Sequence, residues 1–198
     1  MMPAALAMLE QAGAAALAAD GPEGAMRAIA QGCFDTLGAR IAHLRPGALK
    51  GDERQYFVAG TFLVTPDRRH HMLVGSIGFP AEQRRLMVPI DGGHPARVMT
   101  ERAALLIANT DEDRGFRQYL KSSRMGSSAY APMLFRGDFL GQIIIAAQAR
   151  HTLRPEDLAV LAAASHLACA VWVAQGGPEW LRYNASPPDA YVAAIRGI

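Results

Sequence analysis

The sequence predicts a single α+β domain, an antiparallel sheet of five to six strands with long helices from both chain ends on one face and loops and short helices on the other. Two pairs of β-branched and aromatic runs, each pair split by a short turn, predict the sheet. Long amphipathic stretches before the first pair and after the second predict the helices. The 198 residues are 51% hydrophobic and 19% charged, which suffices for one core and excludes disorder over most of the chain.

Two helices are expected at the start of the chain. Residues 4–19 are strong helix formers that end at Asp20-Gly21-Pro22, and the absence of a basic n-region favours a retained helix over a signal peptide. Residues 23–45 form the second helix and end before Pro46-Gly47. Its apolar residues follow the 3, 4 and 7 spacing of one helix face: Met26, Ile29, Ala30, Cys33, Phe34, Leu37, Ile41 and Leu44.

The middle of the chain predicts a hairpin and a crossover segment. Strands are expected at 56–64 and 70–77, joined by a Pro-Asp turn, and at 85–90. Pro95 suits the first turn of a short helix over 95–101, with Gly93 or His94 as its cap. A brief strand at 104–108 and a short helix around 113–121 complete this part.

The last part predicts a second hairpin and a long helix. Its strands lie at 127–133 and 140–148, with Gly137 in the turn. Pro132 suits a strand edge, bulge or end, and Gly141 a bulge or close approach. The helix covers 155–175, with Thr152 as N-cap and Gly176-Gly177-Pro178 as its stop.

We therefore divide the chain into an N-terminal helix (1–22), a domain (23–176) and a tail (177–198). The two long helices side by side would cover one face of the sheet. A cleft is then expected between the other face and the segment 78–122.

Charge and cysteine content exclude several classes of function. With 20 basic and 18 acidic residues the net charge is +2, which gives no case for nucleic acid or an anionic membrane as partner. No apolar run is expected to reach the ~18 residues of a membrane span. Cys33 and Cys169 are too few for a disulfide framework and lie in no CxxC pair, so a reducing cytoplasm is expected.

The histidines predict neither a metal nor a haem site. His70 and His71 are adjacent in a predicted strand and point to opposite faces of the sheet, so they cannot share an ion. His94 beside Pro95 is more simply a cap or loop residue. The sequence contains no Ser/His/Asp order and no phosphate loop, so no catalytic residues are assigned.

The order of several short motifs from the third strand onwards resembles the GAF domain family, a small-molecule-binding module of signalling proteins. The resemblance covers about residues 23–175. One departure is Asn109, which stands where the family usually has Asp. The motifs are Met87-Val88-Pro89-Ile90, Gly92-Gly93, Val98, Thr100, Leu106-Ile107, Asn109, Ser127-Ser128, Ala131-Pro132-Met133, Gly137, Leu140-Gly141 and Leu153 with Glu156-Asp157-Leu158.

The resemblance implies a ligand pocket between the sheet and the segment after the third strand. Carried over by position, its lining is Phe79, Arg97, Val98, Ile107, Asn109, Phe116, Tyr119, Met125, Ser127, Ser128 and Tyr130. Arg97 and Arg124 would pair with an anionic ligand. The alternative is that Ile107, Phe116 and Met125 are ordinary core residues that fill the space.

The implied function is a stand-alone sensor that binds an unidentified small molecule, needs no cofactor and performs no catalysis. The helices at 23–45 and 155–175 would form a homodimer, and the signal would pass to a partner protein in trans. Two alternatives remain: a structural module with a filled pocket, and a thiol enzyme like the family's methionine-sulfoxide reductases. The last is disfavoured because their cysteines fall in the crossover segment, whereas this chain has none between residues 34 and 168.

Overall fold

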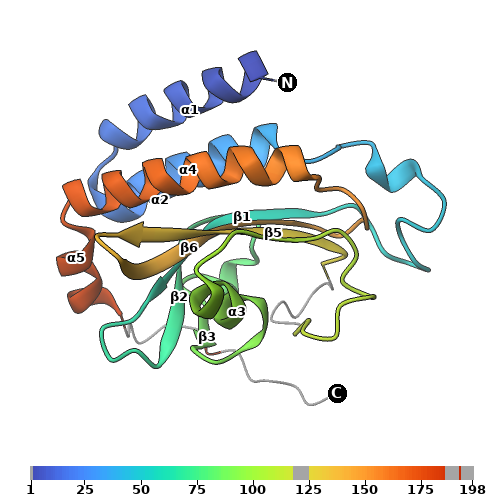
Figure 1. Ribbon diagram of the computed structural model, residues 1–198. Helices are drawn as coiled ribbons and strands as arrows, with labels where there is room; N and C mark the ends of the chain where they lie inside the picture. Colours follow the sequence, from blue (N-terminus) through green and yellow to red (C-terminus); the bar gives the residue numbers. More distant parts are fainter. Residues whose placement is uncertain (1, 118–124, 186–191, 193–198) are drawn as a thin grey trace.

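The computed structural model describes residues 2–117, 125–185 and 192, and it shows one sheet between a helical layer and a layer of loops (Figure 1). The helix layer holds α2, α4 and, outermost, α1. Along the chain the elements are α1 (Met2–Leu17), α2 (Gly21–Thr36), η1 (Ala42–Leu44), β1 (Phe57–Val64), β2 (His70–Ile77), η2 (Ala81–Gln83), β3 (Met87–Pro89), α3 (Gly93–Glu101), β4 (Leu105–Ile107), β5 (Ser127–Phe135), β6 (Asp138–Ala147), α4 (Pro155–Ala174) and α5 (Gly177–Asn184).

The sheet has six strands in the order β3-β2-β1-β6-β5-β4, and every neighbouring pair is antiparallel. Both predicted hairpins are confirmed, β1 with β2 and β5 with β6, and so is the α+β fold class. Gly137 has a φ of +88° in the second turn, which glycine adopts without strain. Pro132 pairs with β6 but lies beyond the short β4, so its missing N–H breaks no ladder on that side.

The sheet separates two apolar layers because successive side chains on a strand point to opposite faces. On β6, Ile143 and Ile145 pack towards the helices, whereas Ile144 and Ala146 point to the other side. We call that other side the distal face. It is covered by the segment from β3 to β5, including α3 (Figure 1).

Helix α2 sits directly on β2 because Gly75 has no side chain. A Cβ at Gly75 would lie 2.4 Å from the Arg27 nitrogen and 2.6 Å from the Met26 carbonyl carbon. Gly75 also has a φ of +64°. Both features require glycine, so this position fixes how closely the helix layer approaches the sheet.

Helix α1 and helix α5 extend the helix layer beyond the predicted domain limits. Met8, Ala12 and Ala16 of α1 are buried in the main core. Trp180 of α5 packs edge-on against Trp172 of α4, with ring centroids 6.0 Å apart. Trp180 therefore packs against the domain, whereas Tyr183 of the same helix is exposed.

Three helix predictions differ from the structure. The second helix ends at Thr36 rather than residue 45, because Leu37 is extended and Gly38 takes a φ of +84°. The N-cap position of α4 is Arg154, whose backbone N–H donates to Asp157, while Thr152 donates its hydroxyl to the Ala149 carbonyl. Residues 113–117 form no helix, and 118–121 lie outside the described residues.

The sequence also missed two helix features. Gly92, not Gly93 or His94, occupies the N-cap position of α3. Gly176 ends α4 but, with a φ of +70°, also begins α5, which was expected to be tail.

Helix α4 is long and apolar enough to cross a bilayer by length and composition, contrary to the expectation that no stretch would be. Seven of its residues are nevertheless buried against the sheet and α2, including Leu161, Cys169 and Trp172. A helix buried in a protein core can have the same length and apolar composition as a membrane-spanning helix.

Candidate functional site

A buried histidine joins three parts of the distal face. His94 lies in the first turn of α3 and is 3% exposed. Its Nε2 is 3.0 Å from Asp113 Oδ1, and its Nδ1 is 3.5 Å from the Tyr130 hydroxyl. Phe116 contacts the ring edge-on, with centroids 6.0 Å apart. We call His94, Asp113, Phe116 and Tyr130 the His94 cluster.

Local structure fixes the orientation of the Asp113 carboxylate. Asp113 Oδ1 also accepts the Gly115 backbone N–H at 2.7 Å, which closes a tight turn after β4. Burial by itself would raise the pKa of Asp113, but the hydrogen bonds from His94 and Gly115 outweigh it and lower the pKa. Asp113 therefore faces His94 as a carboxylate at neutral pH.

Tyr130 defines the other side of the histidine. Burial raises the pKa of Tyr130 to about 12, so the phenol keeps its proton at neutral pH. His94 Nε2–H then donates to the Asp113 carboxylate, and Nδ1 lies 3.5 Å from the Tyr130 hydroxyl. Such a row of hydrogen-bonding side chains can bind a ligand or transfer a proton. It also connects α3 to β5.

A buried glutamine supplies an open hydrogen-bond acceptor next to this cluster. Gln142 of β6 is fully buried and stands opposite Phe62, so it faces the distal side. Its Nε2 donates to the Pro95 carbonyl of α3 at 3.2 Å. Its Oε1 is buried and finds no donor within the part of the chain that the structure describes.

An apolar layer lines the same face. The residues that pack there are Val58, Phe62, Leu73, Leu86, Val88, Met125, Ile144 and Ala146, with Tyr56, Phe79 and Tyr130 partly buried against them. A few directed polar groups in an apolar lining are typical of small-ligand sites.

Six of the predicted lining residues gather at this face. Phe79, Met125 and Tyr130 share the apolar layer, and Phe116 meets Tyr130 across the histidine ring. Val98 and Ile107 pack beside Tyr130 in a small adjoining cluster with Leu105 and Phe139.

Ser128 and Ser127 point in different directions from β5. Ser128 lies two residues from Tyr130, on the same side of the strand. The Ser127 hydroxyl instead donates to the Ile107 carbonyl at 3.3 Å and accepts the Leu153 N–H at 3.2 Å. Ser127 thus ties the end of β5 to the start of α4.

Two other predicted residues are not placed at the distal face. Arg97 is exposed on α3 and pairs with Glu101 at 2.9 Å. Asn109 donates to Glu112 at 2.8 Å and lines a separate pocket described below. Tyr119 and Arg124 lie outside the described residues.

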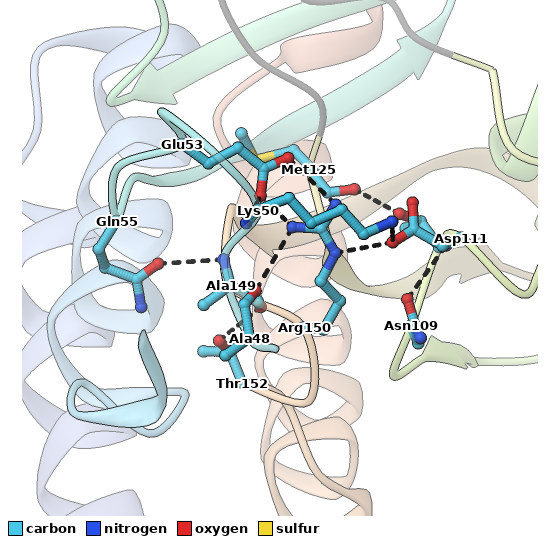
Figure 2. Close-up of polar contacts among 11 residues, drawn as sticks. Ala48, Lys50, Glu53, Gln55, Asn109, Asp111, Met125, Ala149, Arg150 and Thr152 are labelled. Atoms are coloured by element: carbon cyan, nitrogen blue, oxygen red, sulfur yellow. Dashed lines mark hydrogen bonds and ion pairs between the residues drawn. The ribbon is translucent and has the colours of Figure 1, made fainter. Parts of the chain in front are cut away.

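A second polar centre lies at one end of the sheet, around Arg150 (Figure 2). Arg150 is 2% exposed although it is charged. Its Nε donates to Asp111 Oδ2 at 2.9 Å, and its terminal nitrogens donate to both carboxylate oxygens of Glu53. Lys50 also pairs with Asp111. We call these four residues the Arg150 cluster.

The pKa values of the cluster reflect this pairing. The hydrogen bond from Arg150, with help from Lys50, lowers the pKa of Asp111 to about 2 although burial opposes it. Burial alone would raise the pKa of Glu53, and the Arg150 hydrogen bond reverses this and lowers it. Bonded to both carboxylates, the Arg150 guanidinium has a raised pKa.

An open pocket of about 410 Å³ adjoins the Arg150 cluster. Its lining comes from the loop before β1, the turn after β4 and the β6–α4 loop. The lining residues are Arg45, Pro46, Gly47, Ala48, Lys50, Asn109, Asp111, Glu112, Arg150 and His151.

Sequence reasoning missed His94, Asp113, Gln142 and Arg150 as site residues. Arg150 is a single charged residue directly after the apolar run 139–149, and this position could have indicated its burial. The partners of His94 lie 19 and 36 positions away, so no local pattern identified it.

Within the residues described, no group of three His, Cys, Asp or Glu side chains is placed to hold a metal ion. His70 and His71 do not share a site: His71 is fully buried against Phe139, and His70 is partly exposed. Burial lowers the pKa of His71 to about 4, so it stays neutral.

A six-stranded antiparallel sheet with helices on one face and a crossover segment with the short helix α3 on the other defines an α+β fold (Figure 1). The family model described as GAF domain matches residues 21–172. The chain belongs to the GAF domain family. No curated protein matches the sequence.

Solved structures agree with this fold at low sequence identity. The GAF domain of an Acinetobacter phosphoenolpyruvate-protein phosphotransferase superposes with a TM-score of 0.70 at 12% identity, covering 87% of this chain and 94% of that one. Free methionine-R-sulfoxide reductase from Neisseria meningitidis, in complex with its substrate, gives 0.67 at 13%, covering 86% and 89%. A putative GAF sensor protein from Burkholderia vietnamiensis gives 0.62 at 13%, covering 88% and 94%. At such identities these structures show the fold alone.

Proposed function

We propose that this GAF domain binds a small molecule on the distal face, between Gln142 and the His94 cluster, and serves as a sensor rather than a catalyst. The observation that carries the proposal is Gln142 Oε1. A buried acceptor without a donor costs about 1–3 kcal/mol, and a ligand N–H or O–H would remove that cost. The surrounding apolar layer favours a ligand with a mainly apolar body.

The test is a thermal-shift screen of the whole chain against amino acids, their oxidised forms, nucleotides and small carboxylic acids. A compound at a hundredfold excess over its Kd stabilises the folded protein by about 2.7 kcal/mol. Gln142→Leu, which keeps the volume and loses the acceptor, should weaken the hit about tenfold or more. Arg136→Ala, at the exposed β5–β6 turn, is the control and should bind normally.

If no compound shifts the melting temperature of the wild type, the domain is the alternative structural module with a filled site. If a hit binds Gln142→Leu as tightly as the wild type, binding occurs elsewhere and the assignment of the site is wrong.

A second candidate is reduction of free methionine sulfoxide, the activity of the structurally similar reductase from Neisseria meningitidis. Both cysteines of this chain lie in the helix layer, across the sheet from the distal face. Burial raises the pKa of Cys33 to about 12, far from the thiolate such chemistry needs. We expect that the protein does not reduce free methionine-R-sulfoxide when dithiothreitol is the reductant. Activity in the wild type that is lost in Cys33→Ser would instead support the reductase function.

We further propose that the sensor is a homodimer in the cytoplasm, formed through α1 and α4, and that it signals to a partner protein. Leu6 and Leu17 on α1 are 62% and 68% exposed. Beyond its first turn, the exposed positions of α4 follow helical spacing along one face and are alanine except for one histidine: Ala159, Ala163, His166, Ala170 and Ala174. An apolar helix face of this kind favours a second copy as its cover.

A further inference from the structure

The loop between α2 and β1 is held rigidly although it contains only one short turn of 3-10 helix. The Gly38 N–H donates to Asp157 Oδ1 at 3.0 Å, and the Ala39 N–H to the Thr152 carbonyl at 2.9 Å. At the other end, the Arg150 N–H donates to the Ala48 carbonyl at 2.9 Å. We call residues 37–49 the Ile41 loop. It projects past the ends of the helices, in pale blue in Figure 1.

This rigid loop turns two large aliphatic side chains into solvent. Ile41 is 68% and Leu44 72% exposed. In a 3-10 turn, side chains three positions apart lie on the same side, so the two form one apolar patch. The loop's core contacts come from small residues instead, since Ala42 and Ala48 are buried with Ala149.

The patch is framed by positive charge. Arg40 and Arg45 flank the two aliphatic residues, and the sequence has no Asp or Glu from residue 36 to residue 51. Arg40 lies over the Phe57 ring, 4.0 Å from its centroid, with Asp35 acting on it at longer range. Arg45 donates only at 3.5 Å, to the His151 carbonyl, and no carboxylate in the described ranges lies at ion-pair distance from it.

A concave site continues from the patch. Arg45 and Pro46 line the pocket of about 410 Å³, which Arg150 also lines. The other cations of that pocket, Lys50 and Arg150, are already paired with Asp111. The unpaired positive charge of this surface is therefore concentrated at the Ile41 loop.

We propose that the Ile41 loop and this pocket form a docking surface for an acidic segment of a partner protein. Aliphatic side chains of the segment would cover Ile41 and Leu44, and its carboxylates would pair with Arg40 and Arg45. This surface is distinct from the small-molecule site, and it would be the route by which the domain contacts a partner in trans.

The same observations argue against two other occupants. A second copy of the chain bound symmetrically would bring the same arginines together, which is repulsive. A flat anionic bilayer leaves the pocket empty and brings Glu112 on the pocket wall against the headgroups. A protein segment can both cover the apolar patch and occupy the pocket.

The test selects random displayed peptides of about a dozen residues on the full wild-type chain, with counter-selection on the Ile41→Ser/Leu44→Ser double variant. We expect selected peptides to be rich in Asp, Glu and aliphatic residues. Their affinity, measured by fluorescence anisotropy, should fall about tenfold or more in the double variant and in Arg45→Glu, and should weaken as salt rises. Leu134→Ser and Arg136→Glu, exposed on β5 and its turn, are controls and should bind as the wild type does.

The melting temperature of the double variant should stay within about 2 °C of the wild type, because exposed side chains contribute little to stability. A much larger fall shows that Ile41 and Leu44 are core residues and overturns the proposal. Peptides that bind wild type and double variant equally also overturn it. So does binding of phosphatidylserine vesicles, or a dimer that dissociates in the double variant, when no acidic peptide is selected.

Discussion

Arg150 is a charged residue in the interior because its guanidinium meets two carboxylates from loops far apart in the chain. Glu53 precedes β1, Asp111 follows β4, and Arg150 itself follows β6. The planar guanidinium has enough donors in a fixed geometry to bond both acids at once, which an ammonium cannot reproduce. The cluster therefore holds three loops together at one end of the sheet.

Loss of this guanidinium should be costly. In Arg150→Met the volume is largely kept, but Asp111 and Glu53, whose side chains are only partly buried, lose their shared partner. We expect the free energy of unfolding in urea to fall by about 1–3 kcal/mol. The exposed control Arg136→Met should change it by less than about 0.5 kcal/mol. Equal effects in both variants would show that Arg150 is dispensable.

The pH dependence of stability should reveal Asp111. Its pKa of about 2 in the folded state lies below the ordinary value of 3.8, so its contribution is full above about pH 4 and is lost as pH falls towards 2. The difference in unfolding free energy between wild type and Asp111→Asn should thus be largest near neutral pH. It should decrease as the pH falls from 4 to 2. A difference that stays constant across this window would contradict the lowered pKa.

The residues of the candidate site were only partly predictable. Phe79, Met125 and Tyr130 were found because the order of motifs located the segment that covers the distal face. His94 and Arg150 were not, because their roles come from partners up to 97 positions away. The role of a buried ionisable side chain depends on the residues that pair with it in the folded protein. A local sequence pattern does not identify those residues.

At the scale of elements, Gly75 sets the distance between α2 and the sheet. Gly75→Ala would place a methyl group within 2.6 Å of α2 backbone atoms, which cannot move without displacing the helix. We expect a loss of several kcal/mol of unfolding free energy, measured in urea. Gly47→Ala is the matched control, since Gly47 has a φ of +76° but no atom within 4 Å of its Cβ position. It should cost about 1–2 kcal/mol, the price of backbone strain alone.

If the two glycine variants lose the same stability, close packing at Gly75 contributes nothing beyond its backbone conformation. Native-state hydrogen exchange would locate the difference, with faster exchange in α2 expected only in Gly75→Ala.

The strands were predicted well and the helix ends poorly, for a physical reason. β-branched runs and turn residues act locally, so β1, β2, β5 and β6 appear within a few residues of their expected limits. The apolar spacing of α2 continues through Ile41 and Leu44, but Gly38 bonds to Asp157 of α4 and stops the helix at Thr36. That contact joins residues 119 positions apart, so the apolar spacing in the sequence could not reveal where the helix ends.

At the scale of the whole molecule, three regions of the described structure differ in chemistry. The distal face is a covered apolar layer with a few buried polar groups, and the Ile41 loop is aliphatic and cationic. The outer face of α4 beyond its first turn is mostly alanine, and Leu6 and Leu17 are exposed on α1. Only the last is suited to a second copy of the chain, since identical apolar faces do not repel. Ligand, partner and dimer contacts can therefore coexist.

The dimer through α1 and α4 is tested by placing a charge on the outer face of α4. Ala163 is exposed, so Ala163→Arg leaves the monomer fold intact but puts a bulky cation into a symmetric apolar contact. By light scattering after gel filtration, the wild type should have about twice the 21.2 kDa chain mass and the variant the chain mass itself. Ala103→Arg, exposed after α3, should remain dimeric, and the melting temperature of the separated monomer should still rise with a ligand that binds the distal face. A monomeric wild type at all concentrations would exclude this mode of assembly, because the exposed alanine face of α4 would then remain in water.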